Sequence, residues 1–189
     1  DIRIMSDTKT GVSSCPVSNM YLSSGACRIK DLMNAGVKRI GLGVDGPASS
    51  NSSNIMEEMR VSYLLNRLAY GDRPCSAEDI FYMVTAGGAK VLGRDDIGTL
   101  APDKAADITI LNWKQLSYAG GCNDPVDSIV ISGDARMVDT VICNGIKVVE
   151  KHKLTRVNEA EKRDYTNKIG KELLTKASSR IPRLKADIE

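Results

Sequence analysis

The sequence predicts a mixed α/β fold, in which strand–helix units of a parallel sheet precede a small antiparallel sheet and a final charged helix. Three observations support this. The almost entirely apolar segment Val37–Val44 is typical of a strand that is buried on both faces. Strand and helix patterns alternate up to about residue 96, and short β patterns follow after it. The pair Asn144-Gly145, between two such patterns, is a strong signal for a tight hairpin.

The first part of the chain, residues 1–96, is expected to open with two strands and two helices joined by short connections. In chain order these are the strand Gly11–Cys15, the helix Ile29–Ala35, the strand Val37–Val44 and the helix Ile55–Leu68. Asn54 and Glu57 have the spacing of a capping box at the start of the last helix. Two parallel strands alone would leave their edges unpaired, so further strands must come from elsewhere.

A further helix is predicted over Ser76–Leu92, where Ser76 and Asp79 have the spacing of a second capping arrangement. Its apolar face would contain Ile80, Met83, Val84, Gly87 and Val91. The pair Gly87-Gly88 weakens a helix by roughly 1 kcal/mol per glycine. We therefore expect the pair to permit close approach to a neighbouring element.

Residues 97–157 are expected to form a small antiparallel sheet. Its predicted strands are Ala106–Leu111, Asp127–Ile131, Met137–Cys143 and Ile146–Val149. The last part, residues 158–189, is expected to contain a charged helix from about Asn158 to Ser179. Basic residues are enriched between Lys162 and Lys185 with acidic residues interspersed, a pattern typical of a solvated helix face.

Composition excludes several classes of function. The net charge of +2 is too small to indicate a nucleic acid or an anionic membrane as a partner. No apolar run is long enough to span a membrane, and the first residues lack the features of a signal peptide. The five cysteines include no C-x-x-C pair, which indicates reduced thiols in a cytoplasmic protein. Because the chain does not begin with Met, we expect it to be part of a larger protein.

Asp45 is the strongest candidate for a functional residue. It follows a predicted buried strand, and active sites of α/β folds are built at the carboxyl ends of their strands. A carboxylate there can be a metal ligand, a general base or a loop cap, and position alone leaves these open. The surrounding Gly41–Gly46 segment fits G-x-G-x-x-G only formally, because its first two glycines fall inside the strand.

The remaining residues do not suggest a complete catalytic site. The single histidine, His152, follows the antiparallel region, whereas catalytic zinc usually takes three protein ligands, mostly histidines. Cys15 has no adjacent His or Lys that would favour its thiolate. The chain by itself is therefore a poor candidate for a whole enzyme.

Five segments, taken in order, carry a family resemblance. They are Cys15-Pro-Val-Ser-Asn-Met-Tyr-Leu-Ser-Ser-Gly25, Ile40-Gly-Leu-Gly-Val-Asp-Gly46, Thr85-Ala-Gly-Gly-Ala-Lys-Val-Leu-Gly93, the stretch from Ile97 to Leu111, and Val141-Ile-Cys-Asn-Gly145. Together they resemble the amidohydrolase superfamily, and within it the branch of cytosine deaminases, guanine deaminases and triazine (chloro)hydrolases. Ser14 departs from the family, which often has a histidine before Cys-Pro.

The resemblance implies a fold and a metal site. Residues 1–96 would be the last strand–helix units, strands seven and eight, of a (β/α)₈ TIM-like metallo-hydrolase barrel. Residues 97–157 would be the C-terminal part of a small β-sandwich, and residues 158–189 the terminal helix. The family holds a divalent metal, zinc or iron, with histidines of strands one, five and six and an aspartate that ends strand eight. Asp45 matches that aspartate, and the histidines have no counterpart here.

The resemblance also implies an activity. The parent protein would hydrolyse a C–N or C–Cl bond of a purine-, pyrimidine- or triazine-like ring with a metal-activated water, and Asp45 would act both as ligand and as catalytic proton acceptor. Asn19 and Ser49 are candidate substrate-binding residues, with turn and cap roles as alternatives. The expected partners are the small heterocycle and either a second copy or the missing N-terminal part. The alternatives are a non-catalytic module with a binding or oligomerisation surface, or one half of a split enzyme.

Overall fold

A two-stranded parallel sheet lies at the centre of the first part of the chain. The computed structural model describes residues 1–179, so residues 180–189, with the last residues of the predicted basic segment, lie outside the described residues. Strand β1 (Val12–Ser14) pairs with β2 (Ile40–Leu42), and Val12 lies opposite Ile40. Both predicted strands are therefore confirmed, in shorter form.

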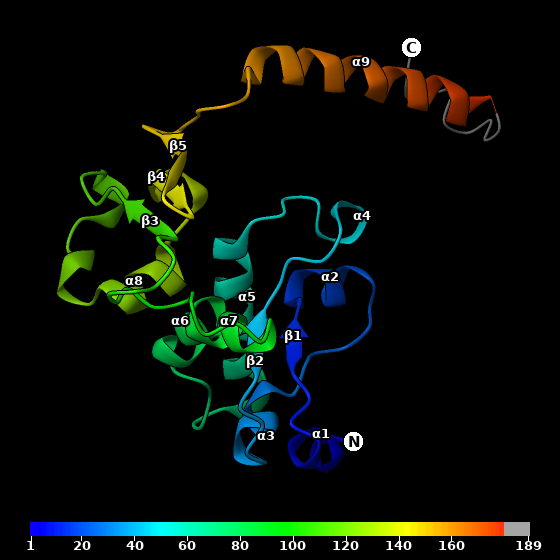
Figure 1. The fold of residues 1–189 in the computed structure, drawn as a ribbon. Coiled ribbons are helices and arrows are strands. Elements are labelled where there is room, and N and C mark those ends of the chain that lie inside the picture. The colour runs from blue at the N-terminus through cyan, green and yellow to red at the C-terminus, as the bar shows by residue number, and fades with distance from the viewer. Residues whose placement is uncertain (180–189) are drawn as a thin grey trace.

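Helices surround this pair of strands, as Figure 1 shows. They are α1 (Ile2–Asp7), α2 (Pro16–Tyr21), α3 (Ile29–Asn34), α4 (Pro47–Ser50), α5 (Ile55–Tyr70), α6 (Ala77–Val84) and α7 (Ala86–Val91). Helices α3 and α5 confirm two predictions. In α5, the Asn54 side chain accepts a hydrogen bond from the N–H of Met56. Glu57 does not complete the predicted capping box, because its carboxylate accepts the hydroxyl of Ser52 instead.

The predicted single helix over Ser76–Leu92 is divided into α6 and α7. Thr85 has φ −117° and ψ −104°, which is not helical, so the backbone turns there. The capping box of Ser76 and Asp79 is present at the start of α6. A Cβ at Gly87 would lie 2.4 Å from the carbonyl oxygen of Ile40 in β2, so the predicted close approach of this glycine to a neighbouring element is confirmed.

The second part of the chain is a four-stranded antiparallel sheet in chain order. Its strands are β3 (Ile108–Leu111), β4 (Val138–Cys143), β5 (Ile146–Glu150) and β6 (Lys153–Leu154). Asn144 and Gly145 have φ 49° and 78°, as a tight hairpin between β4 and β5 requires. Three short 3₁₀ helices also occur in this part, at Leu116–Tyr118, Gly121–Asn123 and Ala135–Met137.

The predicted strand Asp127–Ile131 is wrong, because these residues belong to helix α8 (Pro125–Ser132). The side chain of Asp124 accepts the N–H of Asp127, and Pro125 occupies the first turn, where a missing N–H carries no penalty. Ile129 and Val130 are buried, and α8 packs against α5 and α6. Tertiary burial therefore outweighs the β propensity of this apolar run.

Helix α9 (Glu159–Ser178) confirms the predicted charged helix and extends away from the rest of the chain (Figure 1). None of its residues is buried. The core lies instead between β2, α3, α5, α6 and α8 and is built mainly of aliphatic and methionine side chains, among them Ile29, Ile40, Met59, Ile80, Met83, Val130 and Met137. No helix within residues 1–179 combines the length and apolar character that crossing a membrane requires.

Candidate functional site

Asp45 lies just beyond the carboxyl end of β2, with its backbone in the left-handed region at φ 60°. Its carboxylate accepts three hydrogen bonds. The N–H of Gly46 donates to Oδ1 over 2.7 Å, and the hydroxyls of Ser18 and Ser49 donate to Oδ2 over 2.6 and 3.0 Å. Ser18 comes from α2 and Ser49 from α4, so this carboxylate joins three separate segments of the chain.

These hydrogen bonds also set the charge of Asp45. The hydroxyl of Ser18, then the N–H of Gly46 and the hydroxyl of Ser49, hold the pKa of the Asp45 carboxyl below its usual value. Asp45 is nevertheless exposed. The site therefore presents an ionised and oriented carboxylate to the surroundings. The contacts with Gly46 and Ser49 match the loop-capping alternative, and the role as metal ligand stays a prediction.

The two other predicted site residues, Ser49 and Asn19, differ from each other in burial and in their contacts. Ser49 is buried beside Asp45, and its hydroxyl lies 3.3 Å from the carbonyl oxygen of Gly46 as well. Asn19 lies on α2, one residue after Ser18, and is half-buried. Its backbone N–H donates to the carbonyl oxygen of Cys15, and its own carbonyl oxygen accepts from Ser24. Substrate binding by Asn19 and Ser49 stays a prediction.

Two polar residues near Asp45 were missed by the sequence analysis, namely Ser18 and Glu58. Each is about 1% exposed. The Glu58 carboxylate accepts the N–H of Val17 over 3.0 Å and the hydroxyl of Ser50 over 3.5 Å. Burial raises the pKa of Glu58 above its usual value. A carboxylate one residue before the buried Met59 was the available signal, although its partners could not be read from the sequence.

Cys15 lies near both carboxylates. Burial raises the pKa of its thiol, and the negative charges of Asp45 and Glu58 raise it further. The thiol is therefore protonated at neutral pH, which agrees with the expectation that Cys15 is not a nucleophile. The neighbouring Ser14, at the position where the family often has histidine, is buried, and its hydroxyl has no hydrogen-bond partner among the described residues.

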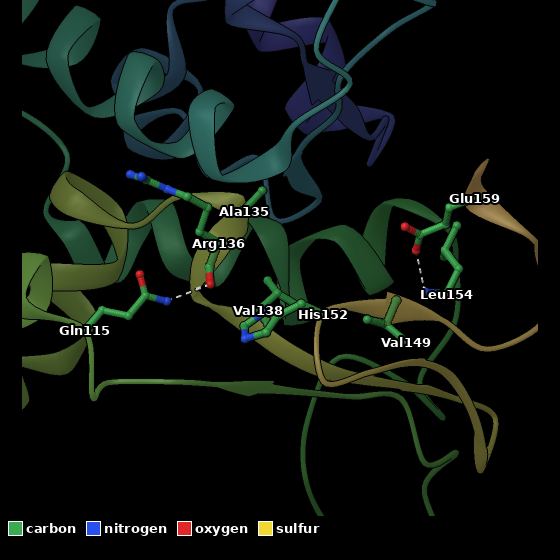
Figure 2. A pocket seen from close by; sticks show the side chains of 8 residues that line it. All are labelled: Gln115, Ala135, Arg136, Val138, Val149, His152, Leu154 and Glu159. Atoms are coloured by element: carbon green, nitrogen blue, oxygen red, sulfur yellow. Dashed lines mark hydrogen bonds between the residues drawn. The ribbon is translucent and has the colours of Figure 1, made fainter. Parts of the chain in front are cut away.

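His152 lies in the antiparallel part, far along the chain from Asp45. It lines an open groove of about 680 Å³, together with Leu154 and Glu159. Figure 2 shows His152 beside Val138. Its Nδ1 lies 2.8 Å from the carbonyl oxygen of Val138, and its Nε2 lies 3.8 Å from a carboxylate oxygen of Asp139. His152 thus lies exposed in the turn between β5 and β6.

The described part of the chain does not form a metal site by itself. Within residues 1–179, no group of three or more His, Cys, Asp or Glu side chains is placed so that it could hold a metal ion. Asp45 offers one carboxylate, and its hydrogen-bond partners are two serine hydroxyls and the N–H of Gly46. A metal ion held by three or more such side chains at Asp45 would therefore need a ligand from outside residues 1–179.

Comparison with known proteins gives the family context. The sequence model of the amidohydrolase family matches residues 1–148. The chain is 37% identical over 160 residues to a 5-methylthioadenosine/S-adenosylhomocysteine deaminase of Pelotomaculum thermopropionicum, covering 84% of this chain and 36% of that protein. It is 38% identical over 150 residues to an 8-oxoguanine deaminase of Pseudomonas aeruginosa, covering 79% and 33%. The chain thus spans about a third of these relatives.

Solved structures agree with the fold. An amidohydrolase from a Sargasso Sea environmental sample matches with a TM-score of 0.79 and 29% identity, over 93% of this chain and 39% of its own. The zinc complex of atrazine chlorohydrolase from Arthrobacter aurescens matches with a TM-score of 0.81 and 25% identity, over 88% and 37%. The resemblance to amidohydrolases with deaminase and triazine hydrolase members is therefore confirmed.

Proposed function

Because this chain belongs to the amidohydrolase family, we propose that it is the C-terminal portion of a metal-dependent aminohydrolase. The substrate would be a purine-, pyrimidine- or triazine-like ring, and the reaction hydrolysis of its C–N or C–Cl bond. The observation that carries the proposal is Asp45, an exposed and ionised carboxylate at the end of a parallel strand, in a chain similar to deaminases. Strand ends of this kind are where α/β folds build active sites.

We further propose that β1 and β2 are the seventh and eighth strands of a (β/α)₈ barrel. Among the described residues these strands pair only with each other, which leaves an outer edge on each for neighbours to pair with. The antiparallel sheet of β3 to β6 would belong to a β-sandwich completed elsewhere. The division at residues 1–96, 97–157 and 158–189 is part of this proposal, as is association with an N-terminal part or a second copy.

In this proposal Asp45 contributes one ligand to a zinc or iron site whose other ligands lie outside these 189 residues. A bound metal ion of this kind acidifies a water molecule. The depressed pKa of Asp45 keeps the carboxylate negative at neutral pH, as a metal ligand must be. Ser18 and Ser49 fix its Oδ2, so the carboxylate is held in one orientation. Asn19 and Ser49 remain the proposed substrate contacts.

The test uses the full reading frame that contains this chain, with Asp45→Asn beside a control, Asp72→Asn, in the exposed loop after α5. Ammonia release is measured with S-adenosylhomocysteine, 8-oxoguanine and an aminotriazine, and bound metal by elemental analysis. We expect Asp45→Asn to lower the metal content and to lower turnover by more than about a hundredfold. A loss of that size exceeds the roughly 10- to 100-fold loss that follows when a residue only supports a metal ligand. Undiminished turnover in that variant, or full turnover by these 189 residues alone, would contradict the proposal.

A further inference from the structure

We infer that Glu58 is a positioning residue for Asp45, an inference that rests on the proposed function. The carboxylates of Asp45 and Glu58 both accept hydrogen bonds from helices α2 and α4, and in each helix the two donors are neighbouring residues. Asp45 binds Ser18 of α2 and Ser49 of α4. Glu58 binds the residue before Ser18 and the residue after Ser49, through the N–H of Val17 and the hydroxyl of Ser50.

The location of Glu58 makes it the more buried of the two carboxylates. It lies in the first turns of α5, between Met56 and Met59, which are both part of the core. Helix α2 packs against both α4 and α5, and Figure 1 shows α2 and α4 at the same end of the parallel strands. Glu58 therefore connects the segments that carry Ser18 and Ser49 to a helix that packs in the core.

A buried carboxylate at this position needs a specific reason, because burial of a charge is unfavourable unless hydrogen bonds compensate it. The N–H of Val17 lies in the first turn of α2, where the helix itself provides no acceptor. The hydroxyl of Ser50, which is also buried, needs a partner as well. Glu58 satisfies both groups, whereas an apolar side chain of similar size would leave them unpaired.

The test is amide hydrogen exchange of this chain, followed by NMR. The N–H of Val17 reports on Glu58, and the N–H of Gly46 reports on Asp45, since Gly46 donates to Asp45 and not to Glu58. In Glu58→Met we expect both amides to exchange at least about tenfold faster, relative to the core amides of α6. Val17 loses its acceptor, whereas Gly46 keeps Asp45 as acceptor but loses the support that Glu58 gives to the helices holding Asp45. Glu58→Gln keeps a carbonyl acceptor and should recover most of the protection. Glu57→Gln, at the adjacent exposed position, should leave both amides unchanged.

Faster exchange at Val17 with unchanged exchange at Gly46 would overturn the inference, because Glu58 would then stabilise α2 without affecting Asp45. If Glu58→Met does not fold, Ser50→Ala replaces it as the test variant. In Ser50→Ala the amide of Gly46 should exchange faster, while the amide of Val17 keeps its protection from exchange. Unchanged exchange at Gly46 in that variant would also overturn the inference. Neither measurement reads metal or turnover, so its failure is distinct from failure of the proposed function.

Discussion

Gly87→Ala is expected to destabilise the chain even though alanine favours a helix. The added Cβ would lie 2.4 Å from the carbonyl oxygen of Ile40 and 2.9 Å from that of Tyr82. Both are backbone atoms, so α7 must move away from β2. Overpacking of this kind costs about 1–3 kcal/mol, and the backbone contacts place this case at the upper end. The gain in helix propensity is at most about 1 kcal/mol, so the net loss should be about 2 kcal/mol.

Gly88→Ala is the matched control for this prediction. Its added Cβ would meet only the carbonyl oxygen of Met83, at 3.3 Å, a tight contact with a modest packing cost that offsets the gain in helix propensity of at most about 1 kcal/mol. We expect its free energy of unfolding to lie within about 0.5 kcal/mol of the parent chain. Urea unfolding followed by circular dichroism measures both variants. Equal stability of Gly87→Ala and Gly88→Ala would refute the reasoning, because the close contact with β2 would then carry no cost.

Two further predictions concern the core and the antiparallel part. Met83→Ala should lower the free energy of unfolding by about 2–5 kcal/mol, because this side chain is fully buried. Leu92→Ala, at a position 70% exposed, should change it by less than about 0.5 kcal/mol in the same urea assay. Similar losses in the two variants would contradict the assigned core. Hydrogen bonds from Arg136 hold the pKa of Asp134 at about 2, below the usual 3.8. Its contribution to stability should therefore be present above pH 3.8 and be lost as the pH falls through about 2, and NMR titration of Asp134 near 3.8 in the folded chain would refute this.

The elements that could be predicted are those whose signals are local. Helix α5 has a cap at Asn54 followed by a periodic apolar face, and the hairpin at Asn144-Gly145 depends only on its own backbone. Helix α8 was missed because a run of β-branched residues suggests a strand, whereas Asp124 and Pro125 at its start favour a helix. Helix α2 was missed for a related reason, since Pro16 both ends a strand and begins a helix.

The residues of the candidate site also divide into those that could be predicted from local sequence and those that could not. Asp45 could be proposed from sequence because a carboxylate just after a buried strand is recognisable in one segment. Ser18 and Glu58 could not, because each acquires its role through a partner that is distant in the chain: Ser18 binds Asp45, 27 residues away, and Glu58 binds Val17, 41 residues away. No periodicity or cap pattern encodes such pairs, which arise only when α2, α4 and α5 pack together.

Contacts within this chain orient the carboxylate of Asp45. Its left-handed backbone is an uncommon conformation for a residue with a side chain, and it persists where surrounding contacts fix it. Those contacts are the hydroxyls of Ser18 and Ser49 on one oxygen and the N–H of Gly46 on the other. The strand that precedes Asp45 is in turn held by the close contact between Gly87 and Ile40. Under the proposed function, a carboxylate fixed in this way is ordered before the rest of the site assembles, so assembly would need to orient only the remaining ligands.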